Sequence, residues 1–203
     1  MFRVGLTGGI GCGKSSAVRR FQAHGVGIVD ADAVARAVVQ PGEPALVRIV
    51  AAFGPEAVDA EGRLDRAWMR ARVFQDPEER VRLEQILHPL IRERLQQQVD
   101  ALATQPGVPY VLVDVPLLVE HDYQPLFERI VVVDCTSGQQ LQRIRHRDGS
   151  DDAVIAGIIR AQAARKERLG SATDVLDNTA SLESLYRQVD LLHEKFLAMA
   201  NGL

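Results

Sequence analysis

Short apolar runs alternate along the chain with stretches in which apolar residues recur every three or four positions. The runs predict five short strands, over residues 2–7, 26–29, 108–115, 129–135 and 174–177. Two of them, 108–115 and 129–135, are largely apolar and rich in β-branched residues. That composition is typical of parallel sheets, whose strands are covered on both faces.

The spacing of three and four predicts helices between these strands. We expect them over residues 14–24, from Asp32 to about Val39, and over 43–53, 65–105, 137–147, 151–169 and 182–199. Asp76-Pro77 is typical of a helix start, and Pro89 predicts a restart or a kink after His88. The last helix has a predicted core-facing stripe of Leu182, Leu185, Val189, Leu192, Phe196 and Met199.

Strands that alternate with helices indicate a doubly wound α/β fold with a five-stranded parallel sheet. The mostly helical block over residues 59–105 interrupts this alternation. We therefore expect an inserted helical subdomain within one α/β domain.

Composition and charge narrow the class of protein. The chain has 24 Lys and Arg against 27 Asp and Glu, a formal charge of −3, which argues against a protein that covers duplex nucleic acid. Its apolar runs are far shorter than the ~18 residues of a membrane span, and no signal peptide is evident. Cys12 and Cys135 lack metal-ligand spacing, so we expect two reduced thiols in a cytoplasmic protein.

A glycine-rich segment follows the first predicted strand and opens the first predicted helix. Residues 8–15, GGIGCGKS, match G-x-x-x-x-G-K-S/T, the phosphate-binding loop. Glycines let backbone N–H groups converge on an anion, and the helix adds its positive end. Lys14 would reach the β- and γ-phosphates of ATP, and the Ser15 hydroxyl would bind Mg²⁺. The nucleotide site is accordingly assigned to Gly9, Gly11, Cys12, Gly13, Lys14, Ser15 and Ser16.

A phosphate-binding loop serves kinases, GTPase switches and motor ATPases. The only asparagines, Asn178 and Asn201, do not begin the N-K-x-D motif that a GTPase needs, so a small-molecule kinase is favoured. Two alternatives stay open: a nucleoside or nucleotide kinase of the same fold, and a nucleotide-gated binding switch. The basic stretch over 137–170 also raises RNA contact, although we expect no nucleic-acid partner.

Several charged residues follow predicted strands, where ligands of open α/β sheets bind. Asp30 and Asp32 follow the second strand, and one of them would accept the proton of an acceptor hydroxyl. Asp114 ends the third strand, where a carboxylate would hold Mg²⁺. Each aspartate could instead only cap the next helix. Arg143 and Arg147 share a helical face, from which they would either approach the phosphates on a mobile lid or face solvent.

Six segments in this order resemble motifs of the dephospho-CoA kinase family. They are GLTGGIGCGKS (5–15), IVDADAVAR (28–36), ILHPLIR (86–92), VDVPLLVE (113–120), QLQRIRHRDG (140–149) and VLDNTASLESL (175–185). The resemblance implies an adenylate-kinase-like fold. Its core would comprise about 1–58, 106–136 and 172–203, with a helical CoA-binding insertion over about 59–105 and a lid over about 137–171.

The resemblance also implies an activity, which is transfer of the ATP γ-phosphate to the ribose 3′-hydroxyl of dephospho-CoA. The products would be CoA and ADP, in the last step of coenzyme A biosynthesis. ATP and dephospho-CoA would be the partners, with Mg²⁺ as cofactor, and neither nucleic acid nor membrane is expected. The chain would act as a monomer or a weak homo-oligomer.

The resemblance assigns roles to matching residues. Asp32 would be the base, and Lys14, Arg143 and Arg147 would hold the phosphates during transfer. His88, Arg92 and Glu120 would face dephospho-CoA, and Asn178 would lie near the adenine edge. Ser15 and Asp114 would bind Mg²⁺.

Some positions depart from the family pattern. Cys12 stands where serine is usual, and Ile158, Ala164 and Arg168 stand where arginine, proline and lysine are common. At a helix N-terminus, the Cys12 thiol is expected to have a lowered pKa and to be sensitive to oxidation.

Overall fold

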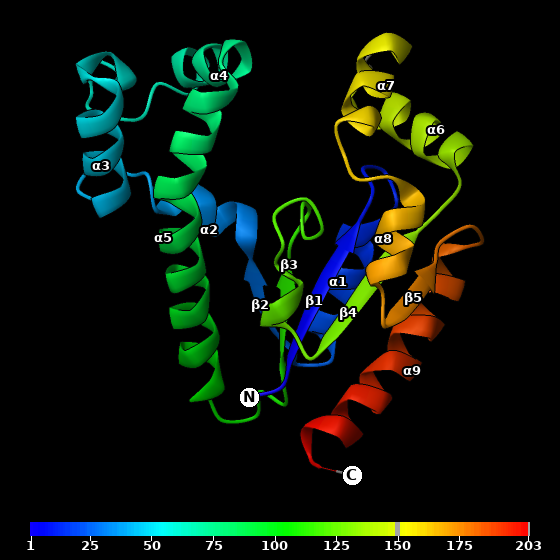
Figure 1. Ribbon diagram of the computed structural model, residues 1–203. Helices are drawn as coiled ribbons and strands as arrows, with labels where there is room; N and C mark the ends of the chain where they lie inside the picture. Colours follow the sequence, from blue (N-terminus) through cyan, green and yellow to red (C-terminus); the bar gives the residue numbers. More distant parts are fainter. Residues whose placement is uncertain (149–150, 203) are drawn as a thin grey trace. The chain divides into compact units, whose positions relative to one another are not determined.

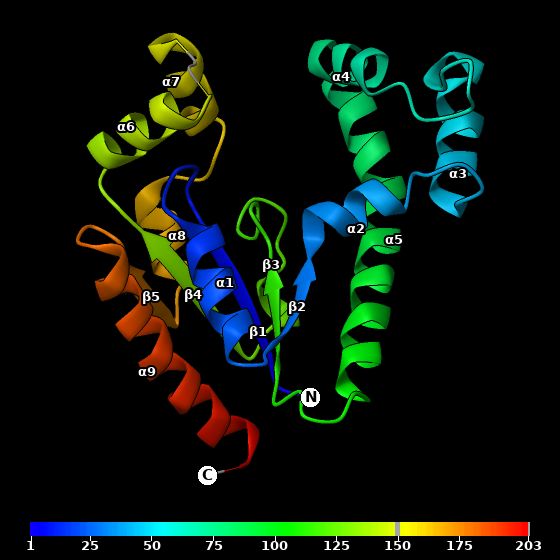
Figure 2. The ribbon, with the colours of Figure 1, turned by 180° about the vertical axis from the view of Figure 1, so that it is seen from behind.

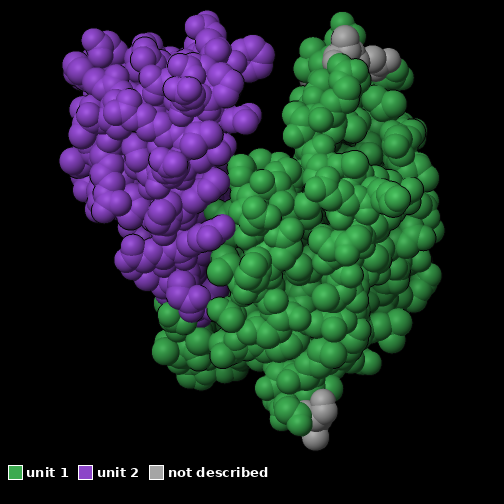
Figure 3. All heavy atoms as spheres, viewed as in Figure 1, with its two compact units in different colours: residues 1–30, 100–203 green, residues 31–99 purple. Residues whose placement is uncertain are grey.

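The computed structural model describes residues 1–148 and 151–202. Residues 149 and 150, which fall in the expected lid, and Leu203 lie outside the described residues. The chain divides into two compact units: unit 1 is Met1–Asp30 with Asp100–Leu203, and unit 2 is Ala31–Val99 (Figure 3). The helical insertion expected over 59–105 overlaps unit 2, which begins earlier in the chain.

Unit 1 is built on a five-stranded sheet whose neighbouring strands all pair in parallel. The strands are β1 (Arg3–Gly8), β2 (Gly27–Asp30), β3 (Val111–Asp114), β4 (Arg129–Asp134) and β5 (Asp174–Asp177). Their order across the sheet is β2-β3-β1-β4-β5. The five predicted strands and the doubly wound α/β class are confirmed.

Helices connect the strands, as parallel pairing requires. Unit 1 contains α1 (Lys14–Ala23), α6 (Ser137–Asp148), α7 (Asp152–Arg160), α8 (Arg165–Ser171) and α9 (Leu182–Ala200), with the short 3₁₀ helix η2 (Gln124–Leu126). Unit 2 contains α2 (Ala31–Ala37), α3 (Pro44–Phe53), η1 (Pro55–Ala57), α4 (Arg66–Gln75) and most of α5 (Pro77–Ala103). Figures 1 and 2 show α1 and α9 on one face of the sheet and α8 on the other.

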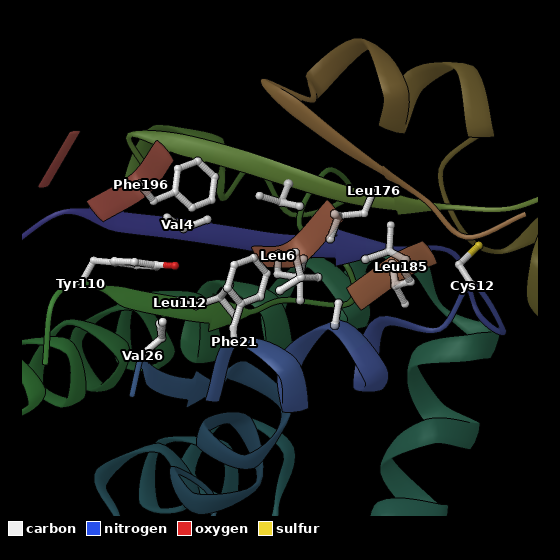
Figure 4. Close-up of a cluster of buried hydrophobic side chains, with 14 of the residues drawn as sticks. Val4, Leu6, Cys12, Phe21, Val26, Tyr110, Leu112, Leu176, Leu185 and Phe196 are labelled. Atoms are coloured by element: carbon white, nitrogen blue, oxygen red, sulfur yellow. The ribbon is translucent and has the colours of Figure 1, made fainter. Parts of the chain in front are cut away.

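The main core of unit 1 fills the space between the sheet and the helices α1 and α9. Phe21 from α1 meets Leu6 and Leu112 from the strands, and Leu185 and Phe196 come from α9 (Figure 4). All five side chains are fully buried. A fully buried side chain of this size contributes about 1.5–3 kcal/mol, so this layer fixes the sheet beneath the glycine-rich loop.

Two helix predictions are wrong in detail. The helix expected over 151–169 is two helices, α7 and α8, separated by residues 161–164. Of the restart or kink expected at Pro89, the restart does not occur, because α5 continues through this residue, and the kink stays a prediction. A proline within a helix removes one N–H donor, and here buried residues of the following turns, Ile91 and Leu95, hold the helix in place.

The predicted stripe of α9 is confirmed at its centre and wrong at its ends. Leu185, Val189 and Phe196 are buried, whereas Leu182 and Met199 are 51% and 37% exposed. The helix has 19 residues and is about 28 Å long, while strands of four to six residues span only about 13–20 Å. Its end turns therefore extend past the surface that the stripe covers.

Within the residues that the structure describes, none of the helices combines the length and the apolar character needed to cross a membrane.

Candidate nucleotide site

The glycine-rich loop joins β1 to α1 at the carboxyl edge of the sheet. Gly13 is the N-cap of α1 and has a left-handed backbone, with φ of 92°. No side chain caps this helix end, and no acidic residue lies in its first turn. An uncapped N-terminus leaves backbone N–H groups available to an anion, which is the geometry expected of a phosphate site.

Two of the glycines lie directly against neighbouring side chains. A Cβ on Gly13 would lie 2.2 Å from Asn178 Nδ2, and one on Gly9 would lie 2.5 Å from Gln140 Nε2. Side chains from β5's end and from α6 therefore press directly against the loop. Any larger residue at these two positions would displace them.

Lys14 forms an ion pair with Asp114, which ends β3. The Lys14 Nζ and Asp114 Oδ1 atoms are 2.5 Å apart, and each side chain is 17% exposed. Asp114 also pairs in register with Leu6 of β1 and Asp30 of β2, so the sheet itself fixes its position. The structure thus brings together two residues that the sequence assigned to phosphate and metal binding.

The two serines after Lys14 lie at the start of α1. Ser15 is exposed, and Ser16 Oγ accepts a hydrogen bond from Arg19 Nη2 at 3.3 Å. A hydroxyl and a carboxylate are the hard oxygen donors that Mg²⁺ prefers, and Mg²⁺ usually takes few ligands from the protein. Ser15 and Asp114 therefore fit this ion. Among the described residues, no three His, Cys, Asp or Glu side chains form a metal-binding group.

Asn178 supports the loop from β5's end. Its side chain is buried and donates from Nδ2 to the Cys12 carbonyl at 2.8 Å. Its own N–H donates to the Asp134 carbonyl, also at 2.8 Å. The resemblance placed Asn178 near the adenine edge, and that role stays a prediction, while its side chain is engaged with the Cys12 carbonyl.

Arg143 of α6 donates to one backbone carbonyl of the loop and to another that follows β5. Its Nη2 donates to Asn178 O at 2.9 Å, and its Nη1 donates to Gly11 O at 3.4 Å. Arg147, one turn further along α6, is exposed. Of the two cations predicted for the lid, Arg143 therefore lies against the glycine loop itself.

The segment between α7 and α8 is attached to the loop by the side-chain amide of Gln162, and α6 is attached to it by that of Gln140. Gln162 Oε1 accepts from Ile10 N at 2.9 Å, and Gln140 Nε2 donates to Ile10 O at 2.8 Å. Glu120 Oε1 accepts from Ala163 N at 2.7 Å. These non-local bonds explain why the predicted helix over 151–169 is interrupted here.

Glu120 therefore contacts the α7–α8 segment rather than standing free. Its second oxygen, Oε2, is buried without a hydrogen-bond partner. The resemblance assigned Glu120 to dephospho-CoA, and that role stays a prediction.

Two arginines of α8, Arg165 and Arg168, form polar contacts near the carboxyl end of β4. Arg165 binds the Asp134 carboxylate through two nitrogens, with the shortest distance 2.6 Å, and this pairing raises the pKa of Arg165. Arg168 is buried and donates to the Ala163 carbonyl. Sequence reasoning counted these cations as part of a basic stretch but assigned them no role. Their density after β4 was the available signal, whereas Gln140 and Gln162 gave none.

The remaining candidates belong to unit 2. Asp32 is exposed in the first turn of α2. His88 and Arg92 lie one turn apart on α5, where His88 is half-buried and Arg92 is exposed. The roles of these three side chains toward dephospho-CoA stay predictions.

The expectation that the pKa of the Cys12 thiol is lowered is wrong in direction. Its side chain is 1% exposed and belongs to the core cluster, so it does not face the uncapped helix end. A hydrogen bond with Cys135 and burial both raise the pKa of Cys12 far above its ordinary value. Both cysteines carry free thiols.

Known proteins are similar in sequence to this one over nearly the whole chain. The sequence profile of the dephospho-CoA kinase family matches residues 2–184. A dephospho-CoA kinase of Nitrosospira multiformis is 44% identical over 203 residues, which cover all of both chains. A second, from Vibrio vulnificus, is 46% identical over 198 residues, with 97% of this chain and 96% of the relative covered.

A solved structure is also similar to this chain. The crystal structure of TT1252 from Thermus thermophilus is 31% identical, with a TM-score of 0.81 over 96% of this chain and 97% of that one. The match of the family profile and the full-length identity to its members show that this chain belongs to the dephospho-CoA kinase family.

Proposed function

We propose that this protein transfers the γ-phosphate of ATP to the ribose 3′-hydroxyl of dephospho-CoA, which yields CoA and ADP. The observation that carries the proposal is the glycine loop with Lys14 and Asp114 paired at its edge, in a chain of this family. Phosphoryl transfer requires little covalent chemistry from the protein, so positioning and charge account for most of the catalysis.

The triphosphate would lie over the loop and the N-terminus of α1. Backbone N–H groups and Lys14 Nζ would bind its oxygens, including those of the transferred phosphoryl group. Gly9, Gly11, Cys12 and Gly13 would contribute backbone, and Ser16, whose N–H donates to the Gly13 carbonyl at 3.0 Å, would contact the nucleotide in the first turn. Asn178 and Gln140 would keep the loop from shifting, because they already contact it.

Ser15 and Asp114 would hold Mg²⁺, which when bound neutralises phosphate charge. Since Asp114 is the partner of Lys14, the carboxylate and the ammonium would meet the nucleotide together.

Asp32 would accept the proton of the ribose hydroxyl as the phosphoryl group arrives. His88, Arg92 and Glu120 would bind dephospho-CoA. Arg143 and Arg147 would add positive charge at the transferred group, as guanidinium groups do in related reactions.

The site of action would be the cytoplasm, and the chain would act there as a monomer or a weak homo-oligomer in the last step of coenzyme A biosynthesis.

The test is an ADP-release assay with Mg·ATP and three acceptors side by side: dephospho-CoA, adenosine and AMP. The proposal predicts turnover with dephospho-CoA at least 100-fold above that with adenosine or AMP. Preferential turnover of adenosine or AMP would instead indicate a nucleoside or nucleotide kinase. Tight nucleotide binding without turnover of any acceptor would indicate a binding switch.

A further inference from the structure

The two cysteines of the chain, far apart in sequence, meet beneath the glycine loop. Cys12 lies in the loop between Gly11 and Gly13, and Cys135 directly follows β4. Their Sγ atoms are 3.1 Å apart, and both residues are buried. Figure 4 shows the Cys12 sulfur at the edge of the core, where the loop passes. The chain has no other cysteine, so these thiols have no competing partner.

The surroundings of the pair differentiate the two sulfurs. Hydrogen bonding with Cys12 lowers the pKa of Cys135, against the effect of burial, and the charges of Arg143 and Arg165 lower it further. The same hydrogen bond raises the pKa of Cys12. Of the two thiols, Cys135 therefore ionises more readily, although the Asp134 charge opposes the lowering of its pKa, and a thiolate is the reactive form of cysteine.

We propose that Cys12 and Cys135 form an oxidation site, at which hydrogen peroxide converts the two thiols to a disulfide that weakens ATP binding. The functional part of this inference rests on the proposed nucleotide site, whereas the thiol chemistry rests on the geometry alone.

The reaction balances in two steps. The Cys135 thiolate attacks the peroxide, so an S–O bond forms, the O–O bond breaks, and the leaving hydroxide takes up a proton to become water. The Cys12 sulfur then attacks the Cys135 sulfenic acid, so the S–S bond forms and the S–O bond breaks. The hydroxyl leaves with the Cys12 proton as a second water. Two electrons pass from the thiols to the peroxide.

The disulfide would change the loop because the sulfurs must approach. A disulfide bond is about 2.05 Å long, so the pair has to close by about 1 Å. The backbone of Cys12 is held by Asn178 at its carbonyl and by Gly9 at its N–H, at 3.0 Å. A displacement of this size moves loop N–H groups away from the phosphates, and the loss of about one hydrogen bond to a charged group corresponds to roughly 10-fold weaker binding.

The experiment treats the full-length protein with hydrogen peroxide, unfolds it in guanidinium, blocks free thiols with iodoacetamide and maps the peptides. The expected product is one cross-linked peptide pair that is lighter by two hydrogens and regains both thiols with dithiothreitol. Calorimetric titration should show Mg·ATP binding weakened by roughly 10-fold and restored by the reductant.

The control variant is Cys135→Ser, which lies outside the nucleotide contacts. In this variant, Cys12 should still react with iodoacetamide after peroxide treatment. The affinity of the treated variant for Mg·ATP should stay within twofold of that of the untreated variant. The proposal is overturned if wild-type Cys12 and Cys135 are recovered uncross-linked after peroxide, or if the cross-linked protein binds Mg·ATP as well as the reduced one. It is also overturned if peroxide lowers the Mg·ATP affinity of Cys135→Ser as much as it lowers that of the wild type. Peptide mapping needs no kinase activity, so failure of the proposed function would be seen separately, as absent turnover in the reduced protein.

Discussion

Lys14 is one of only three lysines in the chain, and the fold places it against a carboxylate at the edge of the sheet. Neither member of the pair is strongly exposed, so Coulomb attraction between them is less screened than at an open surface. The pair keeps the ammonium extended toward the carboxyl ends of the strands. A flexible lysine that is already oriented loses less side-chain entropy when a phosphate arrives.

Replacement of this lysine is expected to abolish most of the activity. Lys14→Ala should lower kcat by about 100-fold or more, because a charge that stabilises the transferred phosphoryl group is removed. The matched control is Lys195→Ala, since Lys195 also pairs with an aspartate, Asp174, at 2.5 Å. Steady-state ADP release measures both variants, and circular dichroism melting checks that each is folded. Equal losses of activity in the two variants would contradict the role of Lys14.

The choice between Asp30 and Asp32 as the base is also a residue-scale question. Both are exposed and follow β2 in the chain, so burial does not distinguish them. Asp32→Asn should lower kcat by roughly 100-fold or more while KM for ATP changes little, because removal of a general base affects the chemical step. Asp30→Asn should retain most of the activity. The reverse ranking in the same assay would assign the base to Asp30.

At the scale of elements, α1 and α9 are joined by a network of polar side chains beside the core. Asp190 of α9 accepts from Arg20 at 2.6 Å and lies 2.7 Å from His24 Nε2. His24 stacks on His193, whose Nδ1 lies within hydrogen-bonding distance of the Tyr110 hydroxyl, at 2.9 Å. Burial raises the pKa of Tyr110, which keeps its hydroxyl a donor. Burial favours the neutral form of His193, whose Nδ1 can then accept from this hydroxyl.

This network predicts a loss of stability in weak acid. Burial, together with the nearby His24, lowers the pKa of His193 below its usual 6.5. Below that pH the unfolded chain binds a proton that the folded chain resists, so the free energy of unfolding falls as pH drops from about 6.5. Hydrogen bonds from Arg20 and His24 lower the pKa of Asp190, so its stabilising contribution is lost only at pH values below about 3.8.

Thermal melting at about pH 7.5 and pH 5 measures the effect. His193→Asn keeps an acceptor for Tyr110 but cannot titrate. We expect Tm to fall less between these pH values in the variant than in the wild type. The difference should be about 2–4 °C for each kcal/mol by which protonation of His193 destabilises the folded wild type. Identical pH dependence in both proteins would show that His193 does not resist protonation in the folded state.

The segment between α7 and α8 offers a second test at this scale. Glu120→Ala removes the acceptor of the Ala163 N–H, so hydrogen exchange over 161–164 should become faster. Because Gln162 in this segment binds Ile10, KM for ATP should rise by about 3- to 10-fold. Glu120→Gln keeps an oxygen acceptor and should resemble the wild type in both measurements. If Glu120→Gln is as impaired as Glu120→Ala and KM rises for dephospho-CoA instead, the carboxylate acts on the substrate.

At the scale of the whole molecule, the predictable features are the local ones. The strands were predictable because their apolar runs are short and continuous. The loop was predictable because the residues of its motif are consecutive in the chain. Gln140, Gln162 and Asn178 support the loop from positions more than 120 residues away in the chain. No pattern in one sequence marks such contacts. The interruption after α7 was missed for the same reason, since the bonds of Glu120 and Gln162 outweigh local helix propensity.

The contact between the two cysteines has the same origin. Each lies in a predicted α/β segment, but only the parallel pairing of β1 with β4 brings them to the same edge of the sheet. The sequence suggested an activated Cys12 from its place at a helix end, whereas the side chain packs inward against Cys135.

The central claim is that the glycine loop and Lys14 hold the triphosphate for transfer, and a crystal structure with Mg²⁺ and a non-hydrolysable ATP analogue tests it most directly. The account predicts the β- and γ-phosphates within hydrogen-bonding distance of backbone N–H groups over residues 11–16, with Lys14 Nζ on a phosphate oxygen. A triphosphate bound elsewhere, with the loop N–H groups and Lys14 free of it, would contradict the account.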